Sequence, residues 1–452
     1  MPSTTPATGP LTVCRKNPRY FTDESGRAIY LTGSHCWANF KDMGTDDPPR
    51  PFDFSAYLDF MVEHHHNFMR MWTWELAKYT YDGTPSYITP FPWPRTGPGN
   101  ALDGKPKFDL SRFNPAYFDR LRARVIAAGE RGIYVSIMLF EGHGLHASLA
   151  PWCRDGHPFH IENNVNRIAG DPDNTGRMLD THTLKIPEVT RLQEAYVRQV
   201  IDTVNDLDNV LYEITNESGA YGTEWQYHLI DIIHDYEKAK TKSHPVGMTF
   251  QFARESRGTN ENLFNGPADW ISPNPDGGYR DDPPAADGSK VILTDTDHLW
   301  GLGCEKGWVW KSFTRGMNPI LMDPYQPFEG ISDHPDWGPI NDPDNPFWQP
   351  FRNDMGATRR YAERINLTDM VPRNDLASTS YCLANPGSEY LVYLPEGGTV
   401  TVDLSDAAGN LSVEWFSPET GEVREGDVSR GGETGAFSPP FEEEAVLYLR
   451  GE

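Results

Sequence analysis

The chain has 452 residues, of which 38% are hydrophobic and 12% aromatic, and its formal net charge is −25. This composition excludes a disordered chain, and the length predicts one large domain followed by a smaller one. Because phosphate binding needs a basic face, the acidic balance argues against a nucleic-acid partner.

Cysteine spacing and hydropathy argue against further classes of protein. The five cysteines are scattered and form no CxxC pair, which indicates neither a zinc ribbon nor a disulfide framework. No window approaches the roughly 18 apolar residues of a membrane helix, and residues 1–13 lack the basic and apolar regions of a signal peptide. We therefore expect a cytoplasmic protein with no membrane partner.

Strand-like and helix-like patterns alternate along residues 1–372. After a hairpin at 19–35, Asn114 and Pro115 predict the N-cap and first turn of a helix. Eight strands are predicted within residues 28–35, 67–75, 132–144, 209–218, 245–252, 269–275, 290–297 and 318–325. The repeated βα order and the near-continuous apolar strands indicate a parallel sheet, and eight units favour a (β/α)₈ TIM barrel. A doubly wound sheet would need a Gly-rich phosphate loop at its first turn, and none is present.

The pattern changes at residue 373. From there to residue 452 the chain has short alternating strands divided by Pro-Gly, Glu-Gly-Gly and Glu-Thr-Gly turns, with no helical stripe. This pattern predicts a C-terminal antiparallel β-sandwich domain.

Polar and aromatic residues crowd the predicted strand ends. In a TIM barrel the chemistry lies at the carboxyl ends of the strands. A pair of carboxylates there suits glycosidic cleavage, in which one acid protonates the leaving oxygen and one carboxylate acts on the opposite side. The candidates from the eight strand ends are His35, Trp37, Arg70, Trp72, Glu141, His143, Asn216, Glu217, Asp295, Asp297, His298, Asp323 and Tyr325.

The stretch "VILTDTDHLWG" raises a particular question. Asp295 and Asp297 follow a buried run two residues apart, so in an extended chain both project to the same side. Two carboxylates at a strand end are costly unless they are solvated, paired or used. We predict that Asp295 is a nucleophile and Asp297 a neighbour that contacts the substrate, with Asp297 as the competitor for the first role.

"ITNES" at the fourth strand and the carboxylate at the seventh resemble clan A of the retaining glycoside hydrolases. The resemblance implies that Glu217 is the general acid/base, that Asn216 binds the sugar 2-hydroxyl and that Arg70 in "NFMRMW" supports the nucleophile. Most of the clan has Glu where this chain has Asp295. "YLTGSHCWANF", "NFMRMWTWE", "VLYEITNES", "MDPY" and the tail "NPGSEYLVYLPEGG" are more closely similar to the apiosidase-like group of glycosidases, which pair a barrel with a sandwich labelled collagen-binding.

We therefore expect a glycoside hydrolase that needs no cofactor or metal and acts on a carbohydrate, by retention and from the chain end, with plant or microbial oligosaccharides as substrates. Two alternatives remain. One is a degenerate barrel that binds carbohydrate without catalysis, and the other is a metal-dependent hydrolase that uses His35, His143, His298 and Asp323. The proline-rich segment 322–351 should wall the substrate pocket.

Overall fold

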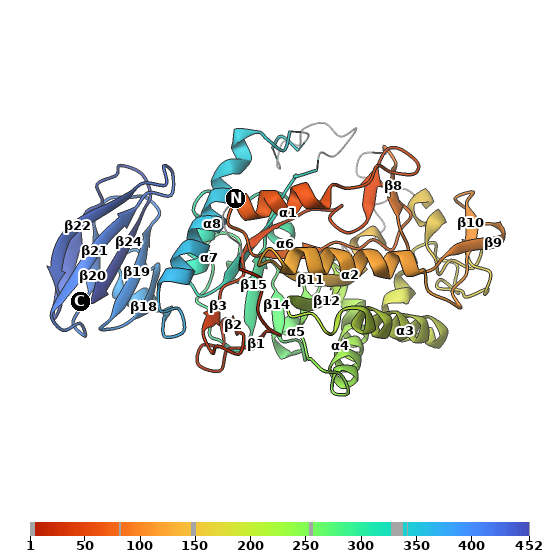
Figure 1. The fold of residues 1–452 in the computed structure, drawn as a ribbon, viewed down its shortest axis with the longest axis horizontal. Coiled ribbons are helices and arrows are strands. Elements are labelled where there is room, and N and C mark those ends of the chain that lie inside the picture. The colour runs from red at the N-terminus through yellow and green to blue at the C-terminus, as the bar shows by residue number, and fades with distance from the viewer. Residues whose placement is uncertain are drawn as a thin grey trace.

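The structure is a computed structural model that describes residues 5–80, 83–145, 151–252, 256–326, 338–340 and 342–451. Its centre is an eight-stranded parallel sheet with the order β4-β16-β15-β14-β13-β12-β11-β6, which is the predicted TIM barrel (Figure 1). The barrel strands are β4 (Gly33–His35), β6 (Phe68–Met71), β11 (Tyr134–Glu141), β12 (Val210–Asn216), β13 (Val246–Thr249), β14 (Trp270–Ser272), β15 (Val291–Asp295) and β16 (Asn318–Met322).

Asn67 closes the barrel between its first two strands. The backbone N–H groups of Asn67 and Phe68 donate to the carbonyl of Thr32 at 2.9 and 3.1 Å. The Asn67 amide also accepts from the Thr32 N–H and donates to the carbonyl of Tyr30. The sheet therefore has no free edge at this point, as a barrel requires.

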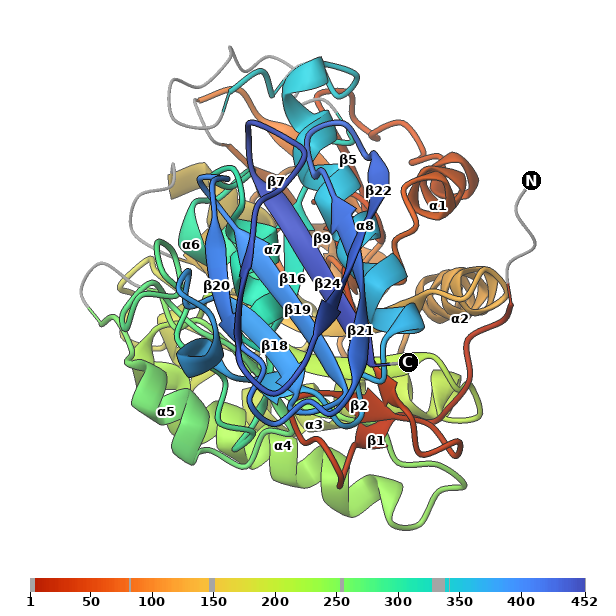
Figure 2. The ribbon, with the colours of Figure 1, turned by 90° about the vertical axis from the view of Figure 1, so that its left-hand side faces the viewer.

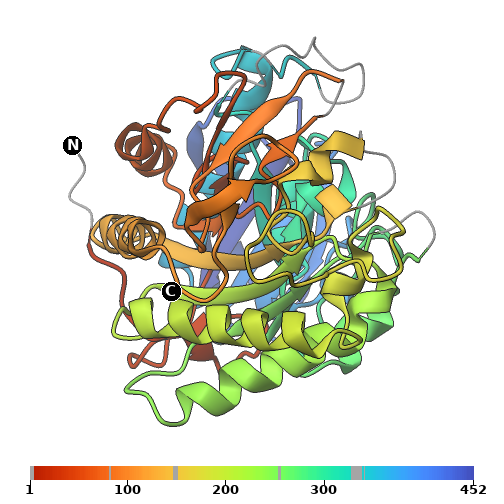
Figure 3. The ribbon, with the colours of Figure 1, turned by 90° about the vertical axis from the view of Figure 1, so that its right-hand side faces the viewer.

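Amphipathic helices surround the barrel, and α2, α3 and α4 lie side by side along one flank (Figure 3, orange to green). Asn114 caps α2 by accepting from the Ala116 N–H, as its place before Pro115 predicts. The α-helices are α1 (Phe54–Glu63), α2 (Pro115–Gly129), α3 (Pro187–Val204), α4 (Thr223–Glu237), α5 (Asn260–Asn265), α6 (Thr296–Leu299), α7 (Trp308–Thr314) and α8 (Gln349–Arg364). Short 3₁₀ turns are η1 (His143–Leu145), η2 (Pro151–Gly156), η3 (Leu179–His182), η4 (Ala220–Gly222), η5 (Pro346–Trp348) and η6 (Asn374–Leu376).

Short strands also form outside the barrel, before its first strand and in the loops after its first two strands. An N-terminal antiparallel sheet forms from β1 (Thr12–Val13), β2 (Phe21–Thr22) and β3 (Ala28–Ile29). The loops after β4 and β6 carry a second sheet and a hairpin that the sequence pattern did not predict. These strands are β5 (Asp42–Gly44), β7 (Lys78–Tyr79), β8 (Ser86–Thr89), β9 (Arg95–Asn100) and β10 (Pro106–Phe108).

The C-terminal domain is the predicted β-sandwich. Its six-stranded sheet has the order β17-β18-β19-β24-β21-β22, and β20 pairs with β23 to form the second layer. The strands are β17 (Val371–Pro372), β18 (Cys382–Asn385), β19 (Glu389–Leu394), β20 (Val400–Asp403), β21 (Asn410–Phe416), β22 (Val423–Arg430), β23 (Thr434–Phe437) and β24 (Ala445–Gly451). The sheet thus begins at Val371, two residues before the predicted boundary, because β17 pairs with β18.

The large sheet of the sandwich packs directly on the barrel through α7 and α8 (Figure 2). Side chains alternate along β19, so Tyr390 and Val392 enter the sandwich core while Leu391 and Tyr393 face Trp310 of α7. Through this continuous apolar contact the sandwich supports the barrel. None of the described helices is long and apolar enough to span a membrane.

Candidate functional site

A cavity of about 370 Å³ lies at the carboxyl ends of the barrel strands. Aromatic side chains, four of them tryptophans, form part of its wall, and rings of this kind stack on the faces of sugars. The predicted residues that line it are Trp37, Trp72, His143, Asn216, Glu217, Asp297 and His298. The sequence analysis did not select Trp74, Tyr79, Phe250, Phe252, Arg257 or Trp300, which line it as well.

Glu217 directly follows β12 and faces this cavity. Its φ is +47°, in the left-handed region that a residue with a side chain rarely adopts. Oε2 of Glu217 lies 2.8 Å from Nδ1 of His143, and both side chains are largely buried. Burial opposes protonation of His143, but the hydrogen bond and charge of Glu217 outweigh it and raise the pKa of His143 to about 9.

Asp297 faces Glu217 from the seventh strand end. The expectation of an extended chain here is wrong, because β15 ends at Asp295 and α6 begins at Thr296. Asp295 Oδ1 caps this short helix by accepting from the Asp297 N–H at 2.9 Å. The helical turn therefore carries Asp297 into the cavity and leaves Asp295 behind it.

Asp295 is fully buried and does not line the cavity. Nε2 of His35 lies 3.0 Å from both of its carboxylate oxygens, and Arg70 Nη1 donates to Oδ2 at 2.8 Å. Burial alone would raise the pKa of Asp295, but His35 and Arg70 hold it below its usual range. Asp295 is thus an ionised carboxylate whose oxygens are already engaged by protein donors.

Arg70 contacts both the fourth and the seventh strand ends from inside the barrel. Its guanidinium makes a bidentate pair with Glu213 at 2.8 and 2.5 Å and donates to Asn216 Oδ1 at 2.6 Å. Nη1 also lies 3.2 Å from Oδ2 of Asp297. The predicted support of a seventh-strand carboxylate by Arg70 therefore has a geometric basis, and it extends to both Asp295 and Asp297.

Glu217 and Asp297 bring their carboxyl groups close together at the cavity. A carboxylate oxygen of each residue and a ring nitrogen of His298 all lie within 4.8 Å of one another. Burial, together with the negative charges of Glu217 and Asp295, raises the pKa of Asp297 well above its usual range. Two buried carboxylates this close do not both ionise readily, so we expect the pair to share one proton.

Four predicted substrate contacts do not line the cavity, which corrects their placement. His35 is buried against Asp295, and Glu141 is buried, its carboxylate accepting from the Gly144 N–H. Asp323 is buried in a bidentate pair with Arg352 at 2.7 and 2.6 Å. Tyr325 packs its ring among Phe52, Tyr57 and Phe60. Each lies at a strand end as predicted, but its neighbours separate it from the cavity.

The set predicted for a metal is not assembled, because His35 and Asp323 have the separate partners given above. In the part of the chain that the structure describes, Glu217, Asp297 and His298 are the residues close enough to share an ion. However, Nε2 of His298 lies 3.2 Å from Asn216 Oδ1, an oxygen that already accepts from Arg70, so this nitrogen must donate and cannot ligate. Burial lowers the pKa of His298 to about 3, so its ring is neutral. The residues present do not fit a metal centre.

Residues 327–337 and 341 of the proline-rich segment predicted to wall the pocket lie outside the described residues.

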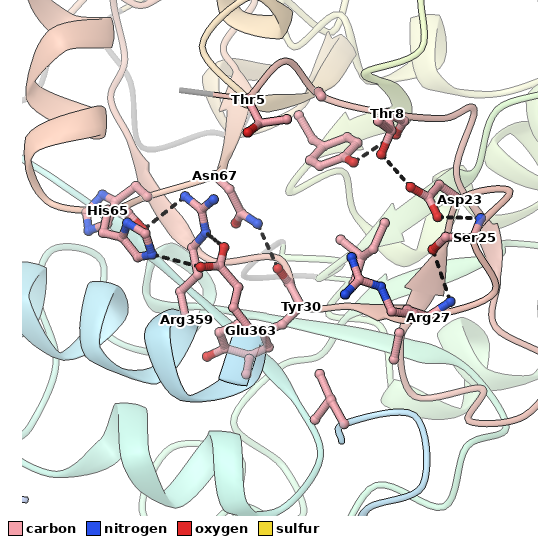
Figure 4. Close-up of a pocket in the computed structure, with 18 of the residues that line it drawn as sticks. Thr5, Thr8, Asp23, Ser25, Arg27, Tyr30, His65, Asn67, Arg359 and Glu363 are labelled. Carbon is pink, nitrogen blue, oxygen red and sulfur yellow. Dashed lines mark hydrogen bonds and ion pairs between the residues drawn. The ribbon is translucent and has the colours of Figure 1, made fainter. Parts of the chain in front are cut away.

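A larger cavity, of about 600 Å³, lies at the opposite end of the barrel (Figure 4). Polar side chains on its wall pair with one another. Glu363 accepts from Arg359 at 2.6 Å and lies 3.1 Å from His65, and Asp23 accepts from the hydroxyl of Thr8. Since these groups satisfy one another, the cavity at the carboxyl ends of the strands is the better candidate site.

The stability that His143 contributes should depend on pH. Its folded pKa of about 9 exceeds the ordinary value near 6.5, so this stability is complete below about pH 6.5 and is lost as the pH rises through 9. The free energy of unfolding in urea should therefore differ between the protein and a His143→Gln variant by an amount that shrinks from about pH 6 to about pH 10. A difference that is constant across this range would contradict the ion pair with Glu217.

Comparison with known proteins bears on the fold. A family model described as "Domain of unknown function (DUF6298)" matches residues 82–252, and one described as "Putative collagen-binding domain of a collagenase" matches residues 368–449. None of the curated proteins compared with the chain matches it.

Solved structures match the whole chain. One described as "Glycoside hydrolase" has a TM-score of 0.59 at 13% identity and covers 98% of this chain and 97% of its own. A family 5 glycoside hydrolase from Bacteroides vulgatus has a TM-score of 0.61 at 15% identity, with 99% and 95% covered. The chain shares their fold. A structure from the same organism, described as a "putative glycoside hydrolase", has a TM-score of 0.62 at 13% identity, with 98% and 82% covered. At these identities the similarity establishes the fold alone, the TIM barrel with its β-sandwich.

Proposed function

We propose that the protein is a glycoside hydrolase in which Glu217 and Asp297 are the two catalytic carboxylates. The observation that carries this proposal is the facing pair itself, one residue from the fourth strand end and one from the seventh, with oxygens within 4.8 Å across an aromatic-walled cavity. Glycosidic cleavage needs an acid and a base on opposite sides of one bond. The fold similarity to glycoside hydrolases supports the same conclusion.

The short separation favours retention of configuration. Retaining enzymes have carboxyl groups roughly 5–5.5 Å apart, whereas inverting enzymes need at least about 6.5 Å to admit a water molecule. We propose that Glu217 is the general acid/base and that Asp297, rather than Asp295, is the nucleophile. Asp297 lines the cavity and contacts Arg70, whereas both oxygens of Asp295 are engaged by Arg70, His35 and a helix N–H.

Catalysis requires the shared proton to lie on Glu217. Burial and nearby charge favour the proton on Asp297 in the free site, while Glu217 pairs with His143. Transfer of this proton from Asp297 to Glu217 leaves the total number of protons unchanged and gives an acid facing an ionised nucleophile. The sugar then forms a covalent ester with Asp297, and Glu217 protonates the leaving oxygen and later activates water.

The substrate is proposed to be an oligosaccharide cleaved from its end. The cavity of about 370 Å³ supports this choice, because it has room for few sugar rings. Chromatography of the products from a defined oligosaccharide should then give one monosaccharide at early times. A ladder of products of intermediate length would contradict exo action but not the proposed roles of Glu217 and Asp297.

Replacing Glu217 with Ala should lower turnover by about 10²–10⁴-fold on glycosides with poor leaving groups, because the departing oxygen then lacks a proton. The loss should be much smaller for dinitrophenyl glycosides, whose leaving group needs no acid. A screen of aryl glycosides and oligosaccharides with the protein and this variant tests the prediction. Equal losses on both substrate classes would remove the acid role.

The same screen addresses the carbohydrate-binding alternative. A non-catalytic binder should show no turnover on any substrate, and its affinity for an oligosaccharide should survive Glu217→Gln. Turnover by the protein that is lost in Glu217→Gln excludes this alternative.

A further inference from the structure

We propose that Glu75 is a positioning residue that holds Glu217 in its catalytic orientation. It does so through two chains of hydrogen bonds, called the first and second arms, which lead to Ser218 and to His143. The inference rests on the proposed role of Glu217. Glu75 does not line the substrate cavity, and its hydrogen bonds with Glu141 and His182 connect it to the residues around Glu217.

Glu217 needs such support because its backbone is strained. A residue with a side chain at φ +47° is strained and persists only where its surroundings impose this conformation. Its neighbours Asn216 and Ser218 are both buried. The contacts of these neighbours therefore decide where the Glu217 carboxylate points.

The first arm runs from Glu75 to Ser218 through His182. Oε2 of Glu75 lies 2.6 Å from Nε2 of His182, whose Nδ1 lies 3.3 Å from the Ser218 hydroxyl. The imidazole is fully buried and stacks on Trp225 with ring centroids 4.4 Å apart. Because Glu75 fixes the proton on Nε2, Nδ1 can accept from the residue that directly follows Glu217.

The second arm runs from Glu75 to His143 through the end of β11. Oε2 of Glu75 accepts from the Glu141 N–H at 3.2 Å, and the Glu141 carboxylate accepts from the Gly144 N–H at 3.1 Å. This bond fixes the turn η1, on which His143 reaches Glu217 at 2.8 Å.

Gly142, between the two ends of this arm, packs on the strained backbone itself. Its N–H donates to the carbonyl of Asn216 at 2.7 Å, and a Cβ on Gly142 would lie 2.6 Å from the Cα of Ser218. A shift of the β11 end is therefore transmitted to residues 216–218.

Charge on Glu75 strengthens both arms. Burial would raise the pKa of Glu75, but His182, His157 and the Glu141 N–H outweigh burial and hold it below its usual value. An ionised carboxylate forms stronger hydrogen bonds than a neutral amide. Glu75→Gln keeps the size and one acceptor but removes this charge, so both arms should loosen without leaving a cavity.

The first test is kinetic and uses Glu75→Gln, Glu217→Ala and the double variant. Glu75→Gln should lower kcat by about 10–100-fold on glycosides with poor leaving groups while KM stays within about twofold. In the Glu217→Ala background the same change should have almost no further effect, because the group that it positions is absent. An additive loss in the double variant would overturn the proposal.

The control is Glu237→Gln, which alters another buried carboxylate paired with a histidine. Glu237 lies 2.8 Å from Nδ1 of His244 at the end of α4, away from the cavity. This variant should lose stability and leave kcat unchanged.

The second test does not depend on turnover. Proton NMR titration of His143 should show its pKa falling from about 9 toward 6.5 in Glu75→Gln, because the contact with Glu217 loosens. Ser218→Ala, which cuts only the first arm, should give a smaller fall and covers the case in which Glu75→Gln does not fold. An unchanged His143 titration in the folded variants would overturn the positioning role, whereas absence of glycosidase activity in the parent protein would overturn the proposed function alone.

Discussion

Asp297→Asn should reduce turnover of every glycoside by at least about 10³-fold while the protein stays folded. The substitution keeps the shape of the side chain but removes the carboxylate that we propose to form the glycosyl ester. Unlike loss of the acid, this loss should be equally large for dinitrophenyl glycosides, since attack at the sugar carbon is needed whatever the leaving group. Initial rates on matched aryl and alkyl glycosides measure both effects.

Asp295 supplies the matched control for this prediction. Azide can enter the space left by Asp297→Ala, which opens on the cavity, and should restore turnover with a glycosyl azide of inverted configuration as the product. Asp295→Ala removes a buried helix cap and partner of Arg70, so azide has no reacting centre there to attack. Azide rescue of Asp295→Ala rather than Asp297→Ala would reverse the two assignments.

Arg70→Met should lower the free energy of unfolding by about 3–5 kcal/mol and reduce turnover as well. Arg70 is fully buried and neutralises Glu213 and Asp295 while it contacts Asp297. Removing one partner of a buried ion pair leaves uncompensated charge in a region of low dielectric constant. Urea unfolding at neutral pH, together with kcat on an activated glycoside, measures the two losses.

Arg122 provides the comparison for Arg70. Its pair with Asp206 lies on the surface, with both side chains well exposed, so Arg122→Met should change stability by less than about 1 kcal/mol. If Arg70→Met proves as stable as Arg122→Met, the buried charges are not balanced as described.

The barrel was predictable because its signal is periodic and local. Strands such as β11 and β12 are buried along their whole length, so they appear in the sequence as apolar runs, and helices with an apolar stripe separate them. The small strands β5 and β7 to β10 lie in loops and are two to six residues long. Segments this short carry too few alternating positions to be recognised in the sequence.

The sequence predicted which strand ends form the site, but not the distances between the residues that they carry. Asn216 was identified because it ends the fourth strand, and Glu217 and Asp297 because they follow the fourth and seventh strands. The preference for Asp295 over Asp297 assumed an extended chain, whereas the chain turns into α6 after Asp295 and places Asp297 at the cavity. Glu213 could have been found as a carboxylate inside the apolar run "VLYEIT", which needs a buried partner.

Trapping with 2-fluoro glycosides, followed by peptide mapping, tests the central claim that Glu217 and Asp297 form a retaining pair. The fluorine slows breakdown of the glycosyl ester, so the nucleophile stays labelled. The account predicts a single adduct on Asp297, formed in the protein and absent from Asp297→Asn. An adduct on Asp295, or turnover of the parent glycoside with inversion and no adduct, would contradict it.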